Sequence, residues 1–413
     1  MANVSKQGMQ PHNAGAPPRP LAGLRVLDLS RILSGPFCTM LLADMGAEVI
    51  KVERPGQGDV ARGMGPRAGG DAAYFMSVNR GKQSVTIDLA KPEGQRLARE
   101  LARRSDVLVE NFLPGAAARM GLDYASLRDV SPRLVYCSIS GFGQDGPYAK
   151  LPALDVIVQA MGGIMSVTGE PGGPPIRPGA SLGDSVAGTF AALAIVSALW
   201  ERERSGVGRH VDVSMLDCQV TMMENAFARY FASGQVPGPL GSRHPAAAPF
   251  QASATADGHI AVAMLTDERE PWERFCRAIG RPELADDERF HDNMARVRNY
   301  EALRPVLEEG MRHKTTKAWT DELTALGIPC GPVNNIAQVA DDAQVRHREM
   351  VREVAHPKLG TWRVANTPFR FDGVGAGPRG GSPALGEHTD EVLRAVLGLS
   401  VEEIKALRKG GVI

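Results

Sequence analysis

Hydrophobic positions in the first half of the chain form short runs that alternate with amphipathic stretches. Residues 24–29 (LRVLDL) and 48–53 (EVIKVE) have the apolar pattern of strands. The stretch between them, 37–45, has helical spacing, with Pro36 near its first turn and Gly46 at its end. The alternation continues with further strands and a helix, at residues 84–89, 91–104, 106–110 and 134–140. This pattern predicts a mostly parallel sheet covered by helices on both faces.

Ligands of such sheets bind beyond the carboxyl ends of the strands. The loops that follow the predicted strands are therefore the expected binding region, at residues 30–35, 54–58, 111–115 and 140–146.

The second half of the chain has a different composition. A strand at 211–214 and a helix at 216–233 are followed by a Pro/Gly-rich linker at 236–249, and a mixed unit then extends to about residue 340. The first residues are rich in Pro, Gly, Ala and Asn and lack the apolar core of a signal peptide. We therefore expect an α/β protein with these parts: a flexible tail (1–20), the N-terminal part of a large domain (21–235), a small α+β domain (245–340) and a C-terminal segment that completes the large domain (341–413).

One stretch, residues 177–201, combines a turn, a carboxylate and a long apolar run. Asp184 follows Gly183 and precedes an uncharged run, 185–200, which is shorter than the roughly 20 residues that span a bilayer. The run therefore predicts a fully buried helix with Asp184 at its start. Two interpretations of Asp184 stay open. It is a helix N-cap, or it is a catalytic carboxylate at the positive end of the helix dipole, beside a glycine that lets substrate approach.

Charge and cysteine content narrow the class of protein. The 413 residues exceed one ordinary core, so two domains are expected. Lys and Arg together number 47, as do Asp and Glu, so no basic field favours nucleic acid or an acidic membrane as partner. The five cysteines are scattered without a CxxC pair, which is typical of reduced thiols in a cytoplasmic protein.

Several well-known catalytic motifs are absent from the sequence. There is no GxxxxGK[ST] phosphate loop, no HExxH or paired Cys/His spacing for a metal, and no GxSxG nucleophile elbow. Residues 141–146 match GxGxxG, but they follow a late strand, and Pro147 and Pro152 argue against the helix that a dinucleotide site needs. Among the common kinds of covalent catalysis, a mechanism that uses a carboxylate nucleophile and no metal therefore remains.

Residues 111–120 provide an amide, an aromatic ring and a guanidinium group after one predicted strand. Asn111, Phe112 and Arg119 would suit a purine and its phosphates. An ordinary strand-to-helix loop with a surface arginine explains them equally well.

Six motifs in order resemble the class III CoA-transferases, which include formyl-CoA:oxalate and carnitine CoA-transferases. The motifs are LAGLRVLDLSRILSGPFCTMLLADMGAEVIKVERPGQGD, VENFLPGAAARMGLDY, SISGFGQDGPY, ASLGDSVAG, GIPCGPV and LGEHTDEVL, and the resemblance runs from about Leu21 to Ile413. It implies a Rossmann-like large domain and a homodimer whose subunits interlock like linked rings. It also implies acyl-CoA and a small carboxylic acid as substrates, with coenzyme A as cosubstrate and no permanently bound cofactor.

The resemblance also assigns residues. Asp184 matches the nucleophile, which forms an aspartyl–acyl anhydride and then an aspartyl-CoA thioester. The nucleotide end of CoA is expected at Arg54, Asn111, Phe112, Arg119 and Met120. The turn residues Ile32, Leu33 and Ser34 match a strip that lines the active site.

Two departures from the formyl-CoA transferases concern the substrate. Leu33 stands where they carry glutamine, and residues 241–250 (GSRHPAAAPF) replace their glycine-rich loop. Both argue against formyl-CoA and oxalate and leave succinyl-CoA and other dicarboxylic or aliphatic acids open.

Two alternatives to a transferase remain. The related alpha-methylacyl-CoA racemases pair the aspartate with a histidine as second base. Leu154 occupies that position here, and no histidine lies between His12 and His210. The other alternative is a relative that binds CoA without catalysis.

Overall fold

The computed structural model describes residues 19–265 and 268–413, so most of the predicted tail, 1–18, lies outside the described residues. Contacts divide the chain into two units. The larger takes in the chain up to Gly162 together with Gly179–Met223 and His347–Ile413, and the smaller comprises Gly163–Pro178 and Glu224–Arg346. Each unit is described by itself below.

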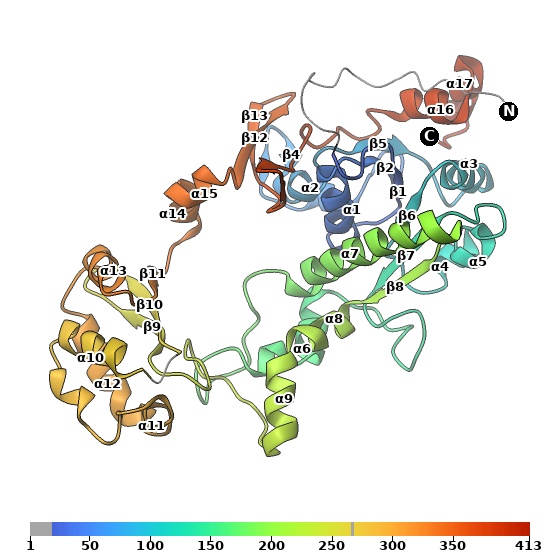
Figure 1. The fold of residues 1–413 in the computed structure, drawn as a ribbon. Coiled ribbons are helices and arrows are strands. Elements are labelled where there is room, and N and C mark those ends of the chain that lie inside the picture. Colours follow the sequence, from blue (N-terminus) through green and yellow to red (C-terminus); the bar gives the residue numbers. More distant parts are fainter. Residues whose placement is uncertain (1–18, 266–267) are drawn as a thin grey trace. The chain divides into compact units, whose positions relative to one another are not determined.

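A parallel sheet forms the centre of the larger unit. In the part of the chain that the structure describes, it has six strands in the order β5-β2-β1-β6-β7-β8, and every neighbouring pair runs parallel. The predicted parallel sheet is therefore confirmed (Figure 1). The strands are β1 (Arg25–Asp28), β2 (Glu48–Glu53), β5 (Gln83–Thr86), β6 (Val107–Glu110), β7 (Val135–Ser140) and β8 (His210–Ser214).

Both faces of this sheet are covered, as the near-continuous apolar strands require. Val26 and Val107 belong to one hydrophobic cluster, whereas their chain neighbours Leu27 and Leu108 belong to another, because successive strand residues point to opposite faces. The first cluster contains residues of α1 (Ser34–Asp44) and α7 (Leu182–Ser205). The second contains residues of α3 (Pro92–Arg103), α16 (Thr389–Leu397) and α17 (Val401–Lys409).

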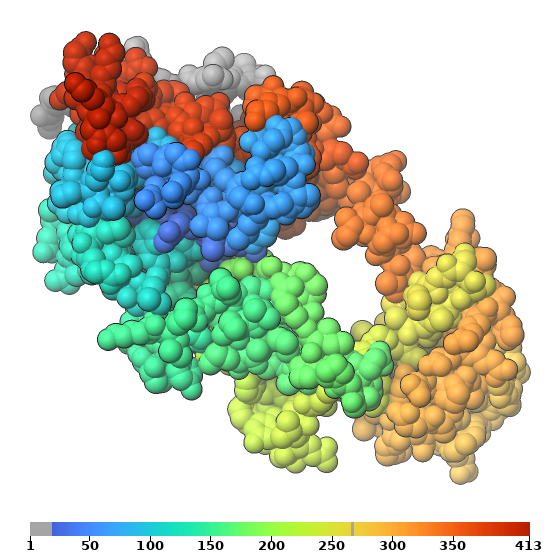
Figure 2. Space-filling view, turned by 180° about the vertical axis from the view of Figure 1, so that it is seen from behind, coloured from blue at the N-terminus to red at the C-terminus, as the bar shows by residue number. Residues whose placement is uncertain are grey.

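The C-terminal segment is part of the larger unit, where the red and cyan surfaces adjoin in Figure 2. The Asp88 N–H donates to the Val412 carbonyl (2.7 Å), and the Thr86 N–H donates to the Thr389 hydroxyl (3.0 Å). These contacts fix the end of the chain beside β5. The remaining elements of this unit are η1 (Val60–Gly63), β3 (Arg67–Ala68), β4 (Asp71–Ala72), α2 (Ala73–Val78), α4 (Ala116–Arg119), α5 (Tyr124–Leu127), α6 (Asp155–Met161), α8 (Met215–Met222), β12 (Val351–His356), β13 (Gly360–Ala365), β14 (Arg370–Phe371) and β15 (Val374–Gly375).

Helix α7 differs from the sequence expectation in its start and in its burial. It begins at Leu182 with Ser181 as N-cap, so Asp184 is the third residue of the helix and the N-cap interpretation is wrong. The predicted full burial is also wrong, because Leu193 and Trp200 are 62% and 71% exposed. The helix is long and apolar enough to cross a membrane by length and composition, but its opposite face packs on α1, β7 and β8 as a core helix does.

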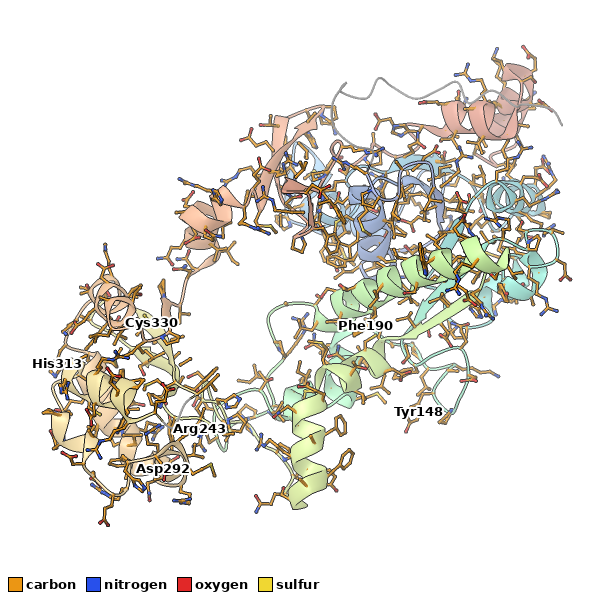
Figure 3. All side chains as sticks on the ribbon, in the orientation of Figure 1. Tyr148, Phe190, Arg243, Asp292, His313 and Cys330 are labelled. Atoms are coloured by element: carbon orange, nitrogen blue, oxygen red, sulfur yellow. The ribbon has the colours of Figure 1, made fainter. Side chains whose placement is uncertain are left out.

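In the smaller unit two strands are followed by a run of helices, as in an α+β unit. An antiparallel sheet of order β11-β10-β9 packs with helices around the buried side chains of Trp272, Phe275 and Trp319. Arg243, which is labelled in Figure 3, has its guanidinium carbon 4.4 Å from the centroid of the Tyr300 ring. The elements are η2 (Ile164–Ser166), α9 (Glu224–Ser233), β9 (Phe250–Ala254), β10 (His259–Ala263), α10 (Arg269–Ala278), η3 (Pro282–Ala285), α11 (Asn293–Arg298), α12 (Tyr300–Met311), α13 (Thr316–Ala325), β11 (Cys330–Pro332), α14 (Ile336–Asp341) and α15 (Ala343–His347).

The boundaries between the units differ in two places from those that the composition predicts. The segment Gly163–Pro178 joins the smaller unit, where the Gly241 N–H donates to the Gly169 carbonyl (2.8 Å). The helix predicted at 216–233 breaks at Met223, and its second part, α9, also belongs to the smaller unit.

Candidate active site

The turn from β1 into α1 lies at the carboxyl edge of the sheet and is anchored by a buried carboxylate. Asp28, at the end of β1, accepts hydrogen bonds from the Ser30 N–H (2.9 Å) and the Thr39 hydroxyl (2.7 Å). The Lys82 ammonium also forms an ion pair with this carboxylate, with its nitrogen 3.0 Å from Asp28 Oδ2. Because these groups are buried, the beginning of the turn is rigidly held.

Asn111 joins this turn to the end of β6. Its Oδ1 accepts the Arg31 N–H (2.8 Å), and its Nδ2 donates to the Arg31 carbonyl (2.8 Å) and the Ser34 hydroxyl (3.2 Å). The structure thereby brings two predicted groups together, the Ile32–Ser34 strip and Asn111.

The Phe112 side chain is less exposed than an aromatic ring that stacks on a purine would be. Its side chain is buried in the core below the sheet edge, and the Arg31 guanidinium lies 5.1 Å from the ring centroid. The Phe112 N–H donates to the Glu110 carboxyl (2.8 Å), whose pKa is raised because the group is buried. Phe112 therefore contributes packing and backbone position to the site.

The other predicted CoA contacts lie in segments that leave the same sheet edge. Arg54 directly follows β2 and is exposed. Arg119 ends α4 and is exposed, whereas Met120 is half-buried against the core. The two guanidinium groups are accessible to phosphate, but the structure shows no direct contact that joins them to the Ile32–Ser34 strip among the described residues.

Asp184 lies half-buried in the first turn of α7. The preceding Gly183 N–H donates to the carboxylate of Asp155, the first residue of α6, at 2.8 Å. A Cβ on Gly183 would lie 2.6 Å from Val158 Cγ2. The glycine thus permits close packing of α6 on α7, and it is not the opening for substrate that the sequence suggested.

A second glycine brings α7 into contact with the start of α1. A Cβ on Gly188 would lie 2.6 Å from the Ser34 carbonyl oxygen and 3.2 Å from the Cys38 nitrogen, so α7 touches the backbone of α1 there. Asp184 and Gly188 are four residues apart and share one face of the helix. The second turn of α7 therefore meets the start of α1, and Asp184 lies one turn before that contact, near the positive end of the α7 dipole.

Sequence reasoning did not assign three residues that shape this site. Arg31 is paired through its backbone with Asn111, Asp155 accepts from the start of α7, and Asp59 accepts from the Ile32 N–H. Asp59 ends the quoted motif RPGQGD, and Asp155 adjoins the position compared with the racemases, so both were within reach of the pattern.

Two further observations concern metal-binding groups and the position of a second base. Among residues 19–265 and 268–413, no group of three or more His, Cys, Asp or Glu side chains could hold a metal ion. At the position where a racemase carries its second base, Leu154 is an exposed aliphatic residue at the start of α6.

Comparison with known proteins identifies the family of the chain. A sequence model of the CoA-transferase family III matches residues 21–389. The succinyl-CoA:glutarate CoA-transferase of Mus musculus is 38% identical, with 96% of this chain and 90% of the relative covered. The acetyl-CoA:oxalate CoA-transferase of Acetobacter aceti is 42% identical, over 90% of this chain and 94% of the relative.

A solved structure shares the fold. The crystal structure of a CAIB/BAIF family protein from Brucella suis has a TM-score of 0.83 and 39% sequence identity, and it covers 92% of this chain and 100% of its own. The chain therefore belongs to CoA-transferase family III and is a class III CoA-transferase, for which coenzyme A is a cosubstrate.

Proposed function

We propose that Asp184 is the nucleophile of this transferase. The observation that carries the proposal is the contact of Gly188 with the Ser34 carbonyl, because it places Asp184 one helical turn from the start of α1, at the carboxyl edge of the sheet. A carboxylate reacts poorly in water, so it needs positioning and nearby donors. The start of α7 supplies a positive field for the oxyanion that forms during attack.

The reaction proceeds in two symmetrical halves. The Asp184 carboxylate attacks the thioester carbonyl, the C–S bond breaks, and CoA leaves as a thiolate. The thiolate then attacks the Asp184 carbonyl of the resulting anhydride, so that the donor acid leaves as a carboxylate and an aspartyl-CoA thioester remains. The acceptor carboxylate attacks this thioester, and the same steps in reverse transfer CoA and regenerate Asp184.

The remaining predicted residues divide between the two ends of the substrate. The Ile32–Ser34 strip, including Leu33, lines the acyl end next to Asp184. Arg54 and Arg119 bind the phosphates, whereas Asn111, Phe112 and Met120 shape the nucleotide end. The exposed guanidinium groups at the sheet edge support this division.

We infer a dicarboxylic substrate pair, with succinyl-CoA as donor and a short dicarboxylic acid such as glutarate as acceptor. The mouse relative supports this choice, because it is named for this pair and is similar to nearly the whole chain. The Acetobacter relative is named for oxalate. Oxalate should therefore be tested as an acceptor beside glutarate, although Leu33 and the altered loop at 241–250 argue against it.

We also propose that the chain works as an interlocked homodimer in the cytoplasm. Leu193 and Trp200 on α7 are 62% and 71% exposed, and Phe231 on α9 is 75% exposed. Large apolar side chains on one helix face favour cover by a partner chain. The five cysteines, all within the described residues, are free thiols, which suits a reducing compartment.

The test is intact-protein mass spectrometry after mixing with succinyl-CoA, with wild type and Asp184→Ala compared. Wild type should gain a CoA-sized adduct that hydroxylamine removes, and Asp184→Ala should gain none and lose at least roughly 1,000-fold in kcat. Asp217→Ala is the matched control, because Asp217 is also an aspartate in a first helical turn, that of α8, but is exposed.

Each other outcome has a defined meaning. An adduct that persists in Asp184→Ala would place the nucleophile elsewhere. Exchange of the α-proton without an adduct would indicate racemase chemistry. CoA binding with neither adduct nor exchange, across a panel of donors, would indicate a relative that only binds CoA.

A further inference from the structure

Ile32 has a backbone conformation that its side chain disfavours. Its φ is 69°, in the left-handed region. A β-branched residue there is a strained outlier, which persists only where surrounding contacts enforce it. Ile32 lies in the β1–α1 turn, two residues before Ser34, whose carbonyl contacts α7 at Gly188, so the strain occurs within the proposed acyl site.

Asp59 contacts the backbone of this residue. Its two carboxylate oxygens lie 3.1 and 3.2 Å from the Ile32 nitrogen and accept its N–H. The Asp59 side chain also accepts the Ala61 N–H (2.9 Å), and its own N–H donates to Glu53 (3.0 Å). With these bonds on both sides, the buried carboxylate has little freedom to move.

Lys51 supplies the opposite charge. Its ammonium lies 2.9 Å from Asp59 Oδ2, and both side chains are fully buried. The same ammonium donates to the Ser30 carbonyl (2.8 Å), two residues before Ile32. Burial alone would raise the pKa of Asp59, but the charge of Lys51 and the N–H donors lower it, so the carboxylate is ionised at neutral pH.

We propose that Asp59 is a positioning residue, which holds Ile32 in its left-handed conformation and thereby keeps the Ile32–Ser34 strip opposite Asp184. Lys51 acts through Asp59 and through the Ser30 carbonyl. The inference rests on the proposed role of Asp184, because the strip matters for catalysis only if the acyl group lies there. A pair that served the core alone would have no need of a strained amide as its third partner.

The experiment compares glycine with alanine at position 32 when Asp59 is removed. Asp59→Ala should lower kcat roughly 10- to 100-fold, as misplacement of a reacting group does, with little change in KM for acyl-CoA. Glycine adopts positive φ freely, whereas alanine retains the Cβ that disfavours it. Adding Ile32→Gly to Asp59→Ala should therefore recover roughly tenfold of the lost kcat, and adding Ile32→Ala should recover none.

The single variants Ile32→Gly and Ile32→Ala serve as controls, because they report the loss of the isoleucine side chain itself. Unchanged kcat in Asp59→Ala, or equal recovery by glycine and alanine, overturns the proposal. If Asp59→Ala does not fold by circular dichroism, Asp59→Leu, which is close in size and has no acceptor for the Ile32 N–H, takes its place.

If neither Asp59 variant folds, the single variants decide by their unfolding temperatures. The proposal expects Ile32→Gly to unfold at a higher temperature than Ile32→Ala, and the reverse order overturns it. Failure of the proposed function is distinguishable, since it appears as retained turnover in Asp184→Ala whatever the result at positions 32 and 59.

Discussion

At the scale of single residues, the site depends on buried charges that hold backbone in place. Asp28 accepts bonds from the turn and from Lys82, and Lys51 lies between Asp59 and the Ser30 carbonyl. Such pairs contribute little net stability compared with apolar substitutes, but removing one partner leaves an uncompensated charge in the interior. Their role here is to give the β1–α1 turn one conformation.

The Asp28–Lys82 pair leads to a prediction about pH. Burial alone would raise the pKa of Asp28, but the charges of Lys82 and Lys51 and the bonds from Ser30 and Thr39 hold it well below its usual value. Burial lowers the pKa of Lys82 to about 8, against the charge of Asp28. At neutral pH both partners are therefore charged.

A carboxyl whose pKa is lower in the folded state contributes stability that is fully present above its unfolded pKa, about 3.9, and is lost as pH falls toward the folded pKa. We expect Asp28→Asn to lower the free energy of unfolding by about 3 to 5 kcal/mol at pH 7 and by progressively less below about pH 4. Denaturant unfolding at pH 7, 5 and 3 measures this. Asp129→Asn, at an exposed carboxylate, is the control, and a difference for Asp28→Asn that does not vary with pH would contradict the assignment.

At the scale of elements, small residues decide how closely the helices approach. Gly183 lets α6 pack closely on α7, and Gly188 does the same for α1. Both glycines lie within about one turn of Asp184. A helix interior normally disfavours glycine by about 1 kcal/mol relative to alanine. Glycine at these two positions is explained by the packing it permits.

Gly188→Ala tests this packing. On an open helix the exchange would stabilise, but here the new Cβ would meet the Ser34 carbonyl at 2.6 Å and push α7 away from α1. We expect a loss of about 1 to 3 kcal/mol in the free energy of unfolding, as in overpacked cores, and a lower kcat because Asp184 moves with the helix. Thermal unfolding and steady-state kinetics report the two effects.

Thr189→Ala provides the matched control, since Thr189 is the next residue along α7 and is exposed. It should leave both stability and kcat nearly unchanged. A Gly188→Ala enzyme as stable and active as wild type would show that the contact between α1 and α7 has room for a methyl group.

At the scale of the whole molecule, α7 has two roles. One face packs in the core of the larger unit, while Leu193 and Trp200 on the other face are exposed. The half-buried Phe190 lies on the same helix (Figure 3). We expect a second copy of the chain to cover this exposed face.

The prediction is that the chain sediments at twice its own mass and does not dissociate on dilution. The double substitution Leu193→Asp and Trp200→Asp should give monomers or aggregates, because buried aspartates would be left without partners. Val130→Asp, at an exposed apolar residue of the larger unit outside α7, should remain dimeric. A wild-type monomer in analytical ultracentrifugation would contradict the dimer, and a dimeric double variant would place the interface elsewhere.

The sequence by itself determined the parallel sheet, the family and the position of Asp184 near a helix start. These depend on local patterns, since apolar runs of strand length alternate with helical spacing and the motifs keep their order along the chain. It did not determine that Ser181, not Asp184, caps α7, because boundaries a few residues apart have nearly the same pattern.

Only the tertiary structure decided how the site is held. Asp59 and Ile32 are 27 residues apart in the chain, and Asp155 and Gly183 are 28 apart, so their contacts depend on the order of strands and on how helices cross. The left-handed conformation of Ile32 also cannot be predicted from the sequence, since isoleucine rarely adopts a positive φ. Local preference can be read from residues alone, whereas strain and long-range hydrogen bonds exist only once the chain has folded.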